Sequence, residues 1–166
     1  MVVIQRLPGG RDVCMVKFDE LVQEFMLREK VALHAPRWRF GNHPDYAQAN
    51  IPLAVEGSPR LLRGRAVLTA HRLRKPPKYG FAILFRGERV FALDVNPGHW
   101  HTNLLNRQRV GGTHWQAWPD MEAMPDQRDQ AYNLWLHEFF RRANVVSRFP
   151  VRSPPQGVQL HLWRKK

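Results

Sequence analysis

The chain has 166 residues, of which 43% are hydrophobic and 24% are charged, as is typical of a folded globular protein. Lys and Arg number 26 against 14 Asp and Glu, so the net charge of +12 favours an acidic partner: nucleic acid first, an acidic protein second and a membrane surface third. No apolar run reaches the ~18 residues that a transmembrane helix needs, and the single cysteine excludes an intrachain disulfide.

Length and cysteine usage also bear on organisation and location. A chain of this length fits one domain, and we expect residues 1–166 to form a single α+β domain. The N-terminal residues lack the basic and then apolar layout of a secretory signal peptide. Disulfides are typical of secreted proteins, and the single cysteine cannot form one within the chain, so we expect a cytoplasmic location. Because no transmembrane run is present, we also expect no membrane partner.

The N-terminal part of the chain predicts a hairpin and a helix. Residues Val2–Leu7 and Asp12–Lys17 flank Pro8-Gly9-Gly10, which is typical of a turn between two strands. Asp19 is the predicted cap of a helix over residues 20–30, whose apolar residues follow helical spacing.

The middle of the chain predicts strands. Residues 34–60 contain four prolines, so we expect irregular chain with at most a short strand at Ile51–Val55. Arg65–Leu73 is a further candidate strand. Tyr79–Phe85 and Glu88–Asp94 form the clearest pair, joined by a tight turn at Gly87, and their apolar residues on both faces favour a central place in the sheet.

The C-terminal part predicts a second helix. Residues 120–129 are acidic, and Pro125, Asp126 and Asp129 favour a helix start. One apolar stripe follows, formed by Tyr132, Trp135, Leu136, Phe139, Phe140 and Ala143. A last strand is expected at Val158–Trp163. The fold class is therefore α+β, a mostly antiparallel sheet of about five to seven strands with two packed helices.

Positive charge is concentrated in blocks. Residues 57–93 hold nine basic residues and one acid, and residues 141–166 hold seven basic residues and no acid. This pattern indicates a basic face, since guanidinium groups suit phosphate and indole rings stack on bases. The residues expected to contact nucleic acid are Arg37, Trp38, Arg39, Arg63, Arg65, Arg72, Arg74, Lys75, Lys78, Trp100, Arg148 and Arg152.

The segment from residue 93 to residue 119 is the best candidate site. It combines Asp94 with His99, His101 and His114, and it also holds three tryptophans. Imidazoles titrate near neutrality and can transfer protons, bind metal or contact phosphate. If the segment is extended, His99 and His101 point to one side and Trp100 to the other.

One interpretation of this segment is a metal-independent ribonuclease. RNA carries its own nucleophile, the 2′-OH, so such an enzyme needs a base, an acid and a cation. His99 or His101 would be the base and His114 the acid. Asp94 would orient an imidazole. The cation that stabilises the charged phosphorane would be Arg107 or Arg109.

Other interpretations stay open. Asp94, His99 and His101 could bind a metal, although their spacing is not that of a common zinc motif. The histidines could instead bond loop backbone or contact phosphate without catalysis, and Asp94 could start a turn. The sequence has no phosphate-binding loop, dinucleotide fingerprint or serine-hydrolase motif, so we expect no cofactor and no metal.

Residues 78–119 resemble a layout found in small proteins of prophages, plasmids and toxin–antitoxin loci, including TumE-like toxins. The matching residues are Lys78-Tyr79, Leu93-Asp94, Asn96, His99, His101, Asn103 and His114. The sequence differs where T-H-W-Q-A-W replaces a second H-x-H, which weakens the case for a shared catalytic or metal pair. The resemblance implies a mobile-element or defence setting and a toxin that acts on RNA.

These observations lead to two expected functions. The first is a basic nucleic-acid-binding protein, with RNA favoured over DNA, that acts as a metal-independent ribonuclease of toxin type. The alternative is a non-enzymatic module that binds nucleic acid or protein, such as an inhibitor of a host defence complex. An acidic protein partner, for instance an antitoxin or a defence-complex subunit, fits either function.

Overall fold

Strands dominate the computed structural model, which describes residues 4–6, 12–14, 17–40, 43, 45–58, 62–75, 77–150 and 152–155. The two helices in these ranges are α1 Phe18–Leu27 and α2 Tyr132–Arg142. The strands are β1 Ile4–Arg6, β2 Asp12–Cys14, β3 Lys30–Ala32, β4 Arg39–Phe40, β5 Tyr46–Ala54, β6 Arg63–His71, β7 Lys78–Phe85, β8 Glu88–Val95, β9 Trp100–Thr102, β10 Arg109–Gly111, β11 His114–Ala117, β12 Met124–Pro125 and β13 Val145–Val146.

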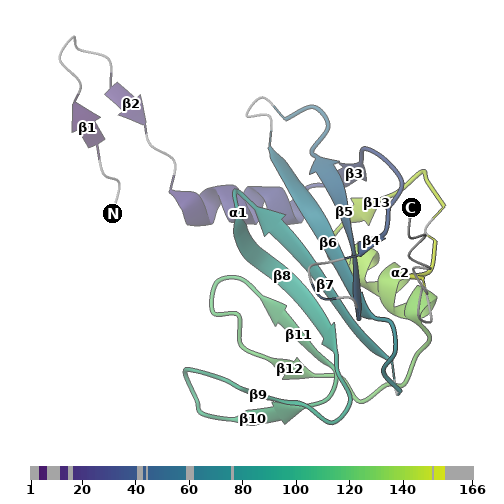
Figure 1. Cartoon of the computed structure of the whole chain (residues 1–166). Helices are drawn as coiled ribbons and strands as arrows, with labels where there is room; N and C mark the ends of the chain where they lie inside the picture. The colour runs from purple at the N-terminus through teal and green to yellow at the C-terminus, as the bar shows by residue number, and fades with distance from the viewer. Residues whose placement is uncertain are drawn as a thin grey trace, which may run out of the picture.

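Nine of these strands form one main sheet (Figure 1), in the order β12-β11-β8-β7-β6-β5-β3-β13 with β4 also paired to β5. All of its pairs are antiparallel except β13 with β3. Strands β9 and β10 form a separate antiparallel ribbon, and the expected N-terminal hairpin is present as β1 and β2. The α+β class is confirmed, and the sheet is larger than the five to seven strands expected.

The predicted central hairpin is confirmed. Strands β7 and β8 lie inside the sheet, and the turn between them places Arg86 and Gly87 at φ of 52° and 94°. Two consecutive positive φ values are typical of the tight turn that matches the twist of paired strands, and glycine adopts them without steric cost. Along β7, buried side chains alternate with half-buried ones, so the strand contributes to the core through one face.

The interpretation of residues 34–60 as mostly irregular chain is wrong for residues 46–54, where the expected short strand at Ile51–Val55 is the end of a longer one. Strand β5 runs over nine residues and pairs with β6 along its whole length. Pro52 lacks an N–H donor, but its carbonyl accepts a hydrogen bond from the Leu33 amide at 3.0 Å. Cross-strand pairing over nine positions therefore outweighs the local cost of one proline. The number of prolines in a segment does not reveal this stabilisation by a distant strand.

Both helices pack on the same face of the main sheet. Phe25 of α1 stacks on Phe85 of β7 at a ring distance of 4.5 Å, and Phe139 of α2 lies 5.5 Å from Phe81 of the same strand. Phe81 and Phe85 are four residues apart in one strand, so their side chains share a face. The predicted apolar stripe of α2 is buried throughout, which confirms it as part of the core.

The predicted helix starts are wrong in detail. Helix α1 begins after Lys17, with Asp19 inside its first turn, and no side chain caps it. Pro125 lies in β12, while the Asp126 carboxylate accepts hydrogen bonds from Trp115 and Arg128. These contacts bind the acidic segment to the sheet, so α2 starts only at Tyr132. The expected strand at Val158–Trp163 lies outside the described residues.

A buried lysine binds the carbonyl groups at the C-terminal end of α1. Lys30 is fully buried, and its Nζ donates to the carbonyls of Phe25, Met26 and Arg28 at 2.8, 3.1 and 2.7 Å. Burial lowers the pKa of this amine to about 8. The ammonium satisfies helix carbonyls that have no partner inside the helix, so it holds α1 against the start of β3.

Candidate nucleic-acid interface and histidine cluster

The face of the main sheet opposite the helices, here called the open face, is polar and basic. Because side chains alternate along a strand, the residues out of phase with Phe81 and its paired neighbours lie on it. Asp94 is the single acid among the polar members, which include four arginines and one lysine. These polar members are Arg39, Tyr46, Gln48, Asn50, Arg63, Arg65, Thr69, His71, Lys78, Arg89, Asp94, His114 and Gln116.

One row of directly paired residues crosses six strands of the open face. It runs Arg39–Gln48–Thr69–Gly80–Asp94–His114, and we refer to it as the polar row. At its centre, the Thr69 hydroxyl donates to the Gly80 carbonyl at 3.1 Å. A Cβ at Gly80 would lie 2.7 Å from Thr69 Oγ1 and 3.3 Å from Asp94 Oδ1. Glycine thus lets two polar side chains approach each other across β7.

The polar row ends in a histidine cluster formed by Asp94, His101 and His114. His114 is buried, its Nδ1 lies 3.1 Å from the Gly112 carbonyl, and its Nε2 lies 3.6 Å from Asp94 Oδ2. The ring of His101 lies 5.2 Å from that of His114. Since β8 and β11 place Asp94 and His114 opposite each other, the sheet register itself brings the acid to the imidazole.

Burial controls the protonation of His114. Desolvation lowers the pKa of His114, and the Gly112 carbonyl and the Asp94 carboxylate oppose this effect. Nε2 is buried without a hydrogen-bond partner among the described residues. Both ring nitrogens are therefore directed at protein oxygens. A ligand would meet half-buried His101 and Asp94, whose side chain is 38% exposed, before it could reach His114.

This environment predicts a pH-dependent stability. The folded-state pKa of His114 lies below its ordinary value of 6.5, so the unfolded chain binds the proton more readily. The free energy of unfolding should therefore fall as pH falls below about 6.5. Urea denaturation at pH 5.5 and 7.5 measures this difference, which His114→Gln should reduce. An unchanged difference in that variant would contradict the assignment.

His99, Trp100 and Arg109 lie in a different place. They line a cavity of about 690 Å³ between the β9–β10 ribbon and residues 125–129. Trp100 is 57% exposed, and the Arg109 guanidinium lies 5.1 Å from its ring centre. His101 pairs with Val110, so it points to the opposite side of the ribbon from Trp100. The expectation that His99 faces the same way as His101 assumed an extended segment, and it does not hold because His99 precedes the ribbon and lines the cavity with Trp100.

Several residues that were predicted to contact nucleic acid form intramolecular contacts that stabilise the fold. Arg74 donates to Asn96 Oδ1 and to the Pro97 carbonyl, both at 3.2 Å, and so ties down the turn after β8. The Arg72 guanidinium lies over the Phe40 ring at 4.4 Å. Trp38 packs against the core. Lys75, by contrast, is exposed in the β6–β7 connection.

Other predicted residues are not brought to the histidine cluster. Arg107 is exposed in the connection between β9 and β10, with φ of 60°. Arg148 and Arg152 follow β13, at the opposite edge of the sheet from β11. Arg89, which was not among the expected site residues, is close enough for its charge to lower the pKa of His114. Sequence reasoning missed it because a register shift in the pairing of β7 with β8 sets the face on which it lies.

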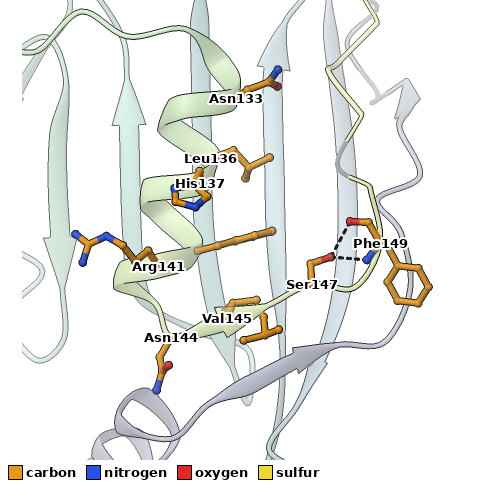
Figure 2. Close-up of a pocket in the computed structure, with 10 residues that line it drawn as sticks. Asn133, Leu136, His137, Arg141, Asn144, Val145, Ser147 and Phe149 are labelled. Atoms are coloured by element: carbon orange, nitrogen blue, oxygen red, sulfur yellow. Dashed lines mark hydrogen bonds between the residues drawn. The ribbon is translucent and has the colours of Figure 1, made fainter.

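A second cavity, of about 570 Å³, lies between α2 and β13 (Figure 2). Leu136, His137, Phe140 and Arg141 of α2 line it together with Val145 of β13. The Arg141 guanidinium is bound to Glu138 at 2.9 Å, so its charge is already compensated. This cavity lies on the helix side of the molecule, apart from the open face.

A metal site gains no support from the part of the chain that the structure describes, which holds no group of three or more His, Cys, Asp or Glu residues able to bind an ion. Neither α1 nor α2 is long and apolar enough to cross a membrane. No protein-family model, curated protein or solved structure matches the chain.

Proposed function

We propose that this protein binds single-stranded RNA across the open face of its main sheet. The observation that carries the proposal is the polar row, which leads from Arg39 through amide and hydroxyl side chains to the histidine cluster. Cations supply the affinity for phosphate, and exposed or half-buried aromatic rings supply surfaces for bases. A sheet face that stacks bases is a recurrent solution in RNA recognition.

Charge supports the same proposal. Arg63 and Arg65 are exposed on β6, and the Lys78 ammonium lies over the Tyr46 ring at 5.8 Å. Tyr46 in turn lies 4.8 Å from His71, so two rings and an ammonium lie together at one end of the face, while Arg63 and Arg65 lie toward the other end. A single strand can place its phosphates on the cations and its bases on these rings, whereas a duplex hides its bases.

The test is a binding titration with a fluorescein-labelled RNA of 12 nucleotides, followed by anisotropy from 50 to 200 mM KCl. We expect log Kd to rise linearly with log salt concentration, with a slope of about 0.7 for each phosphate contacted. A duplex of the same sequence should bind more weakly. Affinity that does not change with salt, or no binding at 50 mM, would contradict the proposal.

Cleavage of the bound RNA is a second candidate function, favoured by the histidine cluster at the end of the polar row. His101 would accept the proton of a 2′-OH as that oxygen attacks the adjacent phosphorus. The bond from phosphorus to the 5′ oxygen then breaks, and the protonated His101 passes the proton it has accepted to the leaving oxygen. Asp94 would hold the His114 imidazole, which is too buried to serve as the expected acid. The products are a 2′,3′-cyclic phosphate and a 5′-hydroxyl end, and no metal is needed.

The non-enzymatic alternative shares the binding surface but not the proton transfers. In that case the protein would hold RNA or an acidic partner protein without turnover, and the histidine cluster would contact phosphate. One measurement distinguishes the two alternatives: RNA is incubated with the purified protein in EDTA, and its length is followed over time.

A further inference from the structure

A third cavity, of about 550 Å³, lies on the open face beside β4. It contains no acid. Two arginines, one histidine and two amides contribute its polar groups, and its lining is His34, Arg37, Arg39, Phe40, Gln48, Asn50 and Pro52. A concave site with several cationic and amide donors and no carboxylate favours an anion that accepts many hydrogen bonds, and a phosphate group is such an anion.

The local fold presents these donors together. Between Arg37 and Arg39, Trp38 packs against the core, with its ring 6.2 Å from that of Tyr132 and its Nε1 donating to the Arg152 carbonyl at 3.0 Å. Because alternate residues of an extended segment point to opposite sides, anchoring Trp38 directs both arginines away from the helices. Arg39 then pairs with Gln48, which places it at the start of the polar row.

The arginines are free to bind a ligand within the described part of the chain. Both are exposed, and neither side chain forms an ion pair or a hydrogen bond with another described residue. His34 Nδ1 lies 2.8 Å from the Ala35 carbonyl, so it carries a proton and leaves Nε2 as the second ring atom available to a ligand. Gln48 Nε2 is held 3.5 Å from Asn50 Oδ1, which orients the two amides.

We infer that this cavity is a phosphate subsite that binds one end of the RNA strand, while the histidine cluster contacts the other end. This inference rests on the proposed RNA binding. Five strand-to-strand steps separate Arg39 from His114, which corresponds to about 24 Å at ~4.8 Å per step. At the ~3.4 Å rise of a stacked strand, this distance spans about seven nucleotides. The subsite therefore sets the position along the strand that reaches Asp94 and His101.

The test compares Arg37→Gln/Arg39→Gln with the matched control Lys17→Gln/Arg86→Gln, which removes two exposed cations away from the cavity. For the labelled 12-nucleotide RNA, we expect the first variant to lose about tenfold in affinity and to lower the salt slope by about 1.4 relative to the control. Two forms of the RNA, with a 5′-phosphate and with a 5′-hydroxyl, distinguish a terminal phosphate from an internal one. A preference for the 5′-phosphate that disappears in the variant identifies the terminal group.

A second measurement uses the unaltered protein. Addition of the 12-nucleotide RNA should shift the side-chain amide resonances of Gln48 and Asn50 in a ¹⁵N-edited NMR spectrum. RNA binding that leaves these resonances in place, or equal affinity of the two double variants, would overturn the subsite while the proposed function stands. An unaltered protein that does not bind RNA would overturn both.

Discussion

Replacement of Arg65 and Lys78 by glutamate is expected to weaken the binding of single-stranded RNA by on the order of 100-fold at 0.1 M salt. Both residues lie on the open face, on the adjacent strands β6 and β7, and on opposite sides of the polar row along these strands. Reversal of two charges removes two phosphate contacts and adds two repulsive ones. The expected loss therefore exceeds that from neutral substitutions at the same positions.

Lys17→Glu/Arg86→Glu is the matched control for this variant. Both residues are exposed, one before α1 and one in the β7–β8 turn, and the net charge changes by the same amount. An acid before a helix also suits the helix dipole, so the control should fold. Equal loss of affinity in the two variants would show that RNA responds to total charge and not to the open face.

Replacement of His101 by alanine is expected to lower the rate of RNA cleavage in EDTA by about 10²- to 10⁴-fold, the usual contribution of a general base. His101 is half-buried, and its ring lies 5.2 Å from that of His114. Asp94→Asn should also slow cleavage, since an amide keeps the shape of the side chain but removes the charge that faces the His114 ring. The measurement is the rate at which 2′,3′-cyclic phosphate ends appear on a labelled RNA.

His137→Ala provides the control for cleavage. His137 lies on the exposed side of α2, in the cavity of Figure 2, and takes no part in the proposed chemistry. Its variant should cleave at the rate of the unaltered protein. Equal activity in all of these proteins would remove the catalytic assignment. Absence of cleavage in each, together with tight RNA binding, would favour the non-enzymatic alternative.

Local signals in the sequence predicted much of the fold. The β7–β8 hairpin follows from two apolar strands around a glycine, and α2 follows from an apolar stripe at helical spacing that is buried from Tyr132 to Ala143. Each of these signals comes from residues close together in the chain. Turn conformation and helical periodicity depend on such neighbours, so a single sequence reveals them.

Other elements could not be predicted because their stability comes from distant partners. Strand β5 contains a proline and weak strand formers, and it exists because β6 pairs with all nine of its residues. Asp126 was expected at a helix start, but Trp115 and Arg128 bind it elsewhere. In both cases a tertiary contact outweighed a local preference.

The candidate site divides in the same way. The sequence by itself determined which residue types are present: an excess of arginine, and an acid with three histidines between residues 94 and 114. Only the tertiary structure decided that Asp94, His101 and His114 form one cluster while His99 and Trp100 line another cavity. The physical reason is strand register, which sets which side chains face each other across a sheet and which side of a ribbon each one occupies.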